Sequence, residues 1–262
     1  MLIDTHTHLE LEDFDRDRDE VIDRARKAGI EFMVTVGTTI GDCKKALSLA
    51  SKYNEVYVAI GIHPHEVKKI DNRTYEDLRE LARMDKVVAY GEIGLDFFRN
   101  LSPMELQIKR FGEQLELACE IGLPVIIHDR EAHKETIEML TARRGRVHGV
   151  VHCFSGDKAM AKKCLDLGFF ISVPGTVTFN KAEVLKEVVK YTPLSSLLVE
   201  TDAPFLAPVP QRGKRNESSF VVHTAAKVAE IKSISLQEIG DATSKNAKTL
   251  FIFDAGTKAG AS

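Results

Sequence analysis

The chain has 262 residues, of which 44% are hydrophobic and 29% charged, as is usual for a soluble globular protein. Its formal net charge of −3 excludes a general electrostatic attraction to nucleic acid or to an anionic membrane, so contact with a polyanion requires a local patch. No apolar run approaches the ~20 residues of a membrane span, and the N-terminus shows no signal-peptide pattern. The four cysteines lack CxxC spacing. We therefore expect a cytoplasmic protein with reduced thiols, no membrane association and no obligate protein partner.

Apolar, β-branched runs recur along the whole chain and predict eight strands. They cover residues 2–9, 31–37, 56–62, 87–96, 124–130, 149–155, 169–175 and 197–204. Charged segments with helical spacing lie between them, so we expect a parallel sheet that helices cover on its outer face.

Eight strand–helix units in about 250 residues match the size of a (β/α)8 TIM barrel. We predict this α/β fold as a single domain over residues 1–254. The alternative is a doubly wound open sheet, although no GxGxxG turn follows the first run. Residues 255–262 are mostly small, and we expect a disordered tail without function there.

Several short patterns predict where helices begin and end. Gly29, Gly122 and Gly168 precede strands, where the end of a helix favours a residue with positive φ. Residues 102–105 (Ser-Pro-Met-Glu) predict an N-cap serine, a proline at the first helical position and a capping-box glutamate. Residues 235–238 repeat the Ser-x-x-Glu pattern.

The first run ends with His6 and His8, two positions apart. In a strand this spacing places both imidazoles on one face, where they can converge on a metal ion. Two histidines do not fill a coordination sphere, and the alternative is a pair of surface histidines on an edge strand.

The ends of the later runs supply further candidate ligands. Functional residues of a barrel lie at the carboxyl ends of its strands, and six of the nine histidines fall at such positions. The histidines and acids there are His6, His8, His63, His65, Glu92, Asp96, His128, Asp129, His152, Glu200 and Asp202.

Four histidines and two carboxylates exceed the needs of one tetrahedral ion but suit two ions with a bridging carboxylate. His6, His8 and Asp202 would then hold one ion. His128 and His152 would hold the other, and Glu92 would bridge the two. The alternative for Glu92 and Asp202 is a buried ion pair.

Five motifs in this order resemble the TatD family of metal-dependent deoxyribonucleases. They are Asp4-Thr-His-Thr-His8, Gly61-Ile-His-Pro64, Gly91-Glu-Ile-Gly-Leu-Asp96, His152-Cys-Phe-Ser-Gly156 and Glu200-Thr-Asp-Ala-Pro204. The match extends from residue 2 to about residue 253. The resemblance implies an amidohydrolase-type TIM barrel, two divalent metal ions (zinc, manganese or magnesium) and hydrolysis of DNA, single-stranded or at a strand end. It implies the same six ligands.

A basic loop follows the eighth run and carries Arg212, Lys214, Arg215 and Asn216. It resembles the family pattern Arg-Gly-x-x-Asn-Glu-Pro, except that Ser218 replaces the proline. Because loops after strands seven and eight of such barrels commonly bind phosphate, we expect these four residues to do so. A solvated charged turn is the alternative.

Two further positions are candidates for substrate contact. The resemblance places His63 as a pocket histidine that contacts the scissile phosphate or a leaving oxygen, with a packed histidine as the alternative. Phe97 or Phe98 could stack a terminal base, or could simply pack the loop after the fourth run. Glu200 and Asp4 are expected to support the site without binding the metal.

The expected reaction is hydrolysis by a hydroxide that the metal generates from water at neutral pH. Asp202 would orient the water or accept its proton, while Glu92 would hold the two ions together. One alternative is a metal-dependent amidohydrolase or phosphoesterase acting on a small molecule. Another is a non-catalytic, metal-stabilised interaction protein.

Overall fold

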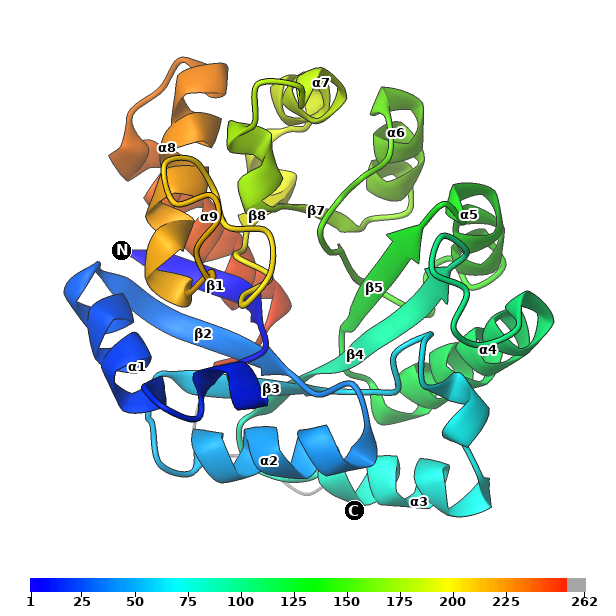
Figure 1. The fold of residues 1–262 in the computed structure, drawn as a ribbon. Coiled ribbons are helices and arrows are strands. Elements are labelled where there is room, and N and C mark those ends of the chain that lie inside the picture. The colour runs from blue at the N-terminus through cyan, green and yellow to red at the C-terminus, as the bar shows by residue number, and fades with distance from the viewer. Residues whose placement is uncertain (254–262) are drawn as a thin grey trace.

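Eight parallel strands follow one another around a barrel in chain order, with helices on the outside (Figure 1). The computed structural model describes residues 1–253, so the predicted tail at 255–262 lies outside the described residues. The strands are β1 (Leu2–Thr7), β2 (Ile30–Val36), β3 (Val56–Ile60), β4 (Val87–Asp96), β5 (Val125–Arg130), β6 (Gly149–Val151), β7 (Phe170–Val173) and β8 (Leu197–Val199).

Nine α-helices are present within residues 1–253. They are α1 (Arg18–Lys27), α2 (Ile40–Ala50), α3 (Asn72–Leu81), α4 (Met104–Ile121), α5 (His133–Thr141), α6 (Lys158–Asp166), α7 (Glu183–Tyr191), α8 (Val221–Lys232) and α9 (Leu236–Leu250). None of these helices is long and apolar enough to cross a membrane. The predicted (β/α)8 barrel is confirmed.

The end of β1 is hydrogen-bonded to the segment that follows β8, which closes the barrel. The main-chain nitrogen of His8 donates to the carbonyl of Ala203 (2.7 Å), and that of Asp202 donates to the carbonyl of His6 (2.9 Å). These bonds join β1 to the segment after β8, which an open doubly wound sheet would leave far apart. They also place Asp202 beside two of the predicted metal ligands.

Apolar side chains close the barrel at the amino-terminal ends of its strands. Phe251 and Phe253, which follow α9, pack with residues at the starts of β2 and β3. The Phe253 ring stacks on Phe32 (centroids 4.9 Å apart) and meets Tyr57 edge-on (4.8 Å). With this end filled by aromatic rings, polar side chains can converge at the opposite end.

The predicted helix ends are confirmed in most cases. Gly29, Gly122 and Gly168 have φ values of 80°, 75° and 84°. Ser235 and Glu238 form the predicted capping box at the start of α9.

The predicted N-cap at Ser102 is wrong. Pro103 occupies the N-cap position of α4 and makes no side-chain cap bond. The Ser102 hydroxyl instead donates to the carbonyl of His65 (2.8 Å). This long-range bond connects the β4–α4 loop to the loop after β3. The hydroxyl therefore bonds to a distant residue instead of capping α4.

Gly94 allows β4 and β5 to approach closely at the level of the site. It lies opposite His128 in the ladder and has a φ of 146°. A Cβ atom at this position would lie 1.9 Å from the carbonyl oxygen of His128. The absence of a side chain therefore sets the position of the strand that carries His128.

We expect Gly94→Ala to destabilise the protein by about 3 kcal/mol or more, because the left-handed backbone and the clash both act against it. Gly112→Ala is the matched control. A Cβ there meets only flexible side-chain ends at 3.5 Å, and alanine should stabilise the interior of α4 by about 0.5–1 kcal/mol. Urea unfolding followed by circular dichroism measures both changes. Equal stability of Gly94→Ala and the wild-type protein would contradict this account.

Candidate metal centre

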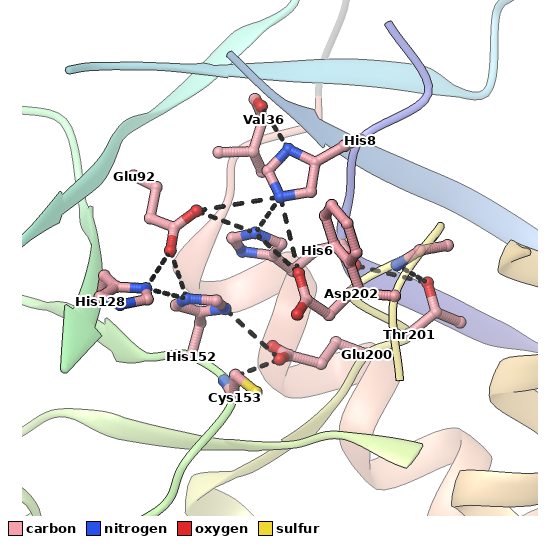
Figure 2. Close-up of polar contacts among 12 residues, drawn as sticks. His6, His8, Val36, Glu92, His128, His152, Cys153, Glu200, Thr201 and Asp202 are labelled. Atoms are coloured by element: carbon pink, nitrogen blue, oxygen red, sulfur yellow. Dashed lines mark hydrogen bonds and ion pairs between the residues drawn. The ribbon is translucent and has the colours of Figure 1, made fainter. Parts of the chain in front are cut away.

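The structure brings all six predicted ligands together at the carboxyl ends of the strands (Figure 2). His6 comes from β1, and His8 lies just beyond it; Glu92 lies in β4 and His128 in β5. The remaining two, His152 and Asp202, follow β6 and β8. Their side chains are between 0% and 16% exposed, so the centre is largely withdrawn from water.

Glu92 lies between two groups of ligands and presents one carboxylate oxygen to each (Figure 2). Its Oε2 lies 3.4 Å from Nε2 of His6 and 3.9 Å from Nε2 of His8. Its Oε1 lies 2.6 Å from both Nδ1 of His128 and Nε2 of His152. The side chain is thus placed to bridge two ions.

The first group has the spacing of a tetrahedral site. The Nε2 atoms of His6 and His8 are 3.3 Å apart, and Oδ1 of Asp202 lies 3.8 Å and 3.5 Å from them. Ligand atoms around a tetrahedral ion with bonds of about 2.0–2.2 Å lie about 3.3–3.6 Å apart. An ion therefore fits between these atoms and Oε2 of Glu92 with little movement.

The candidate ligand atoms of the second group lie closer together than those of the first. Nδ1 of His128 and Nε2 of His152 lie 3.4 Å apart, but both contact Oε1 of Glu92 at hydrogen-bonding distance. An ion bound here would replace the protons of these hydrogen bonds, and the ligand atoms would separate by less than about 1 Å. Nε2 of His63 lies 3.5 Å from the same Oε1. His63, Glu92 and His128 therefore form a further group of candidate ligands.

Both carboxylates of the centre are held in the ionised form. Burial alone would raise the pKa of Glu92, but the imidazoles of His152 and His63 lower it well below its ordinary range. For Asp202, burial also acts to raise the pKa, and the hydrogen bond with His8 and the charge of His6 lower it. These two side chains can therefore bind cations at neutral pH.

Three of the four predicted ligand histidines have a buried carboxylate next to the ring nitrogen that faces away from the centre. Nδ1 of His8 lies 3.4 Å from Oε1 of Glu10 and 2.8 Å from the carbonyl of Val36. Nδ1 of His152 lies 3.4 Å from Oε1 of Glu200. For His8, the carbonyl of Val36 holds the proton on the far nitrogen and leaves the near nitrogen free for a metal, whereas His152 and Glu200 lie at an ion-pair distance.

His128 has the same arrangement with its nitrogens exchanged. Its Nε2 lies 3.1 Å from Oδ2 of Asp96, so Nδ1 is the nitrogen that faces Glu92. Asp96 also accepts from Nε2 of His65 (2.8 Å) and from the main-chain nitrogen of Arg99 (2.7 Å). From the sequence, Asp96 was only one of the acids at the strand ends and Glu10 had no role. The signal for Asp96 was that it shares a strand and parity with Glu92.

Asp4 and Glu200 support the centre as expected, from outside the ligand groups. Asp4 accepts hydrogen bonds from the main-chain nitrogen (2.9 Å) and the hydroxyl (2.7 Å) of Thr201, next to Asp202. Burial raises the pKa of Asp4 to about 7. Glu200 accepts from the main-chain nitrogen of Cys153 (2.7 Å).

His63 is fixed as a neutral hydrogen-bond donor. The main-chain nitrogen of His65 donates to Nδ1 of His63 (3.1 Å), so the proton of a neutral His63 lies on Nε2. Burial lowers the pKa of His63 to about 4, which keeps the ring neutral at physiological pH. Its N–H points toward the ligand groups.

A cavity of about 1000 Å³ opens above the ligands and contains His63 in its wall. Among residues 1–253, the cationic side chains that line it are Arg99, Arg130 and Lys181, apart from histidines. Arg212, Lys214, Arg215 and Asn216, the predicted phosphate-binding residues, are absent from this lining.

The loop that carries the predicted phosphate-binding residues is engaged in folding contacts instead. Asn216 is buried, and its amide nitrogen donates to the carbonyls of Thr201 (2.8 Å) and Phe205 (2.6 Å). Arg215 pairs with Asp17 at 2.7 Å. The sequence shows the charge of this loop but not these partners, and the phosphate role expected for Arg215 and Asn216 stays a prediction.

Arg212 stacks its guanidinium on the ring of Phe179, 4.4 Å from the centroid. The ammonium of Lys214 donates to the side-chain oxygen of Gln211 (2.9 Å). These contacts also lie within the loop and its immediate surroundings. Arg212 and Lys214 therefore have no place in the cavity wall, which the charge pattern alone could not reveal.

Comparison with known proteins gives consistent matches over nearly the whole chain. The model of the family described as TatD related DNase matches residues 3–252. The Bacillus subtilis protein YabD, named an uncharacterized metal-dependent hydrolase, is 44% identical over 96% of this chain and 99% of its own length. A Klebsiella pneumoniae protein named 3'-5' ssDNA/RNA exonuclease TatD is 37% identical over 97% of this chain and 98% of its own.

Among solved structures, the Escherichia coli TatD homologue YjjV superposes with a TM-score of 0.91 at 35% identity. It covers 96% of this chain and 98% of its own. The barrel is therefore shared with a solved TatD homologue, and the sequence is similar over nearly its whole length to proteins named as a metal-dependent hydrolase and as an exonuclease.

We expect Asp96→Asn to weaken binding of a divalent ion about 10–100-fold, because the amide no longer fixes the proton of His128 on Nε2. Competition with a chromophoric chelator for Zn²⁺ or Mn²⁺ measures the affinity. Asp77→Asn, a similar change in α3 next to Arg73, is the control and should bind like the wild-type protein. Unchanged affinity in Asp96→Asn would show that this carboxylate does not prepare the ligand.

Proposed function

Because the chain belongs to the TatD-related DNase family, we propose that this metal-dependent hydrolase cleaves phosphodiester bonds in DNA with two divalent ions. The observation that carries the proposal is the position of Glu92, with one oxygen facing each ligand group. Two ions about 3.5–4 Å apart form a clamp for in-line displacement at phosphorus. The exonuclease name of the Klebsiella relative supports a nucleic acid substrate.

In this proposal His6, His8 and Asp202 hold one ion, His128 and His152 hold the other, and Glu92 joins them. Mixed imidazole and carboxylate ligands suit zinc or manganese, whereas magnesium binds imidazole less well. When bound, the ions supply Lewis acidity that lowers the pKa of an attacking water toward 7 and neutralises charge on the phosphoryl oxygens.

The protein's own groups place the water and the phosphate. Asp202 is ionised and 15% exposed, so it can orient the attacking water and accept its proton. His63 offers its Nε2 hydrogen to a phosphoryl or leaving oxygen. The water attacks phosphorus directly, and no covalent bond to the protein forms. The cavity above the ligands favours this catalytic role over a purely structural ion.

We expect His128→Ala to abolish metal-dependent cleavage of DNA while the protein remains folded, because the second ion loses a ligand. The assay follows a 5'-labelled single-stranded oligonucleotide with and without chelator, and elemental analysis gives the metal content. His148→Ala removes an exposed histidine before β6 and serves as the control, with activity retained. Wild-type activity in His128→Ala, or in the presence of chelator, would contradict the proposal.

A further inference from the structure

The mouth of the cavity has a basic side formed by the ends of two neighbouring strands. Arg130 is the last residue of β5 and lies opposite Asp96 in the ladder. Its carbonyl accepts from the main-chain nitrogen of Phe97 (2.9 Å), so the segment after β4 and the end of β5 form one rim. Arg99 follows in the same segment, and both arginines line the cavity.

These arginines are available to a ligand. Their side chains are exposed, and within residues 1–253 neither forms an ion pair with a carboxylate. The Arg130 guanidinium lies over the ring of Phe98, 4.1 Å from its centroid, and Phe98 is itself 55% exposed. The stacking holds the guanidinium in place while its N–H groups remain free. Arg215, by contrast, is already paired with Asp17.

The opposite side of the mouth carries exposed apolar side chains, with Lys181 just before α7 among them. Phe205 and Leu206, which follow β8, are 51% and 38% exposed and line the same cavity, as does Val184 of α7 (57% exposed). The Phe205 ring meets the ligand histidine His8 at a centroid distance of 6.1 Å. In an eight-stranded barrel β8 lies across from β4, so the basic and apolar sides flank the metal centre.

We propose that this mouth binds single-stranded DNA. The two parts of the strand that flank the scissile bond would lie on opposite sides of the metal centre. Arg99 and Arg130 bind the backbone phosphates on one side of that bond, and an unpaired base packs on Phe205 on the other. Exposed guanidinium groups are suited to phosphate, and base–aromatic stacking requires a base that is not paired in a duplex. The inference rests on the proposed function and moves phosphate recognition from the 212–216 loop to the basic rim.

The test compares two substrates of the metal-loaded enzyme. One is 5'-labelled (dT)10, which carries many phosphates, and the other is thymidine 5'-(p-nitrophenyl) phosphate, which has only the scissile diester. Arg99→Gln and Arg130→Gln should each lower the ratio of kcat/KM for (dT)10 to that for the small diester by at least about tenfold. Each lost phosphate contact should also reduce the slope of log(kcat/KM) against log[NaCl] on (dT)10 by about 0.7.

Matched variants separate this inference from its alternatives. Arg83→Gln removes the same charge from the loop before β4, at the other end of the barrel, and should leave the ratio unchanged. If Lys214→Gln lowers the ratio while Arg130→Gln does not, the 212–216 loop binds the backbone and the inference is overturned. If wild-type enzyme cleaves neither substrate, the proposed function itself fails. Cleavage of both with no effect of the arginine variants overturns only the inference.

Discussion

The carboxylate of Glu92 faces two sets of histidines at once, and the arrangement of the centre depends on this position. Its two oxygens contact His6 and His8 on one side and His128 and His152 on the other. Buried carboxylates carry a high desolvation cost, which neighbouring cations or imidazoles must offset. The histidines therefore have to converge on this point, whether they carry protons or a metal ion.

The barrel supplies that convergence through a few close contacts. The bonds between the ends of β1 and β8 place Asp202 beside His6 and His8. Gly94 lets the strand that carries His128 approach β4. Glu10, Glu200 and Asp96 lie next to the histidine nitrogens that face away from the centre. These carboxylates help to orient the imidazoles without belonging to the predicted ligands.

Much of this could be predicted from the sequence, because alternating apolar and charged segments indicate parallel strands and their ends, and eight such units match the size of a barrel. Period two along a strand was enough to pair His6 with His8. The roles of the loop residues were harder to predict. The position of the loop after the eighth strand and the family pattern suggested that Arg215 and Asn216 bind phosphate, whereas both are engaged by long-range partners, Asp17 and the Thr201 carbonyl. Such partners depend on how distant segments meet, which local patterns do not encode.

The same limit explains the residues that sequence reasoning missed. Arg130 is the last residue of the run that was singled out for His128, but its position over Phe98 depends on the pairing of β4 with β5. The Ser102 hydroxyl bonds to a loop 37 residues away, and its local Ser-Pro-x-Glu pattern gave no sign of that.

Anomalous diffraction from crystals of the protein grown with Mn²⁺ or Zn²⁺ would locate the bound ions. We expect two peaks about 3.5–4 Å apart on either side of Glu92. One should lie within bonding distance of His6, His8 and Asp202, and the other within bonding distance of His128 and His152. A single peak, or two peaks that do not share Glu92 as a ligand, would contradict this arrangement.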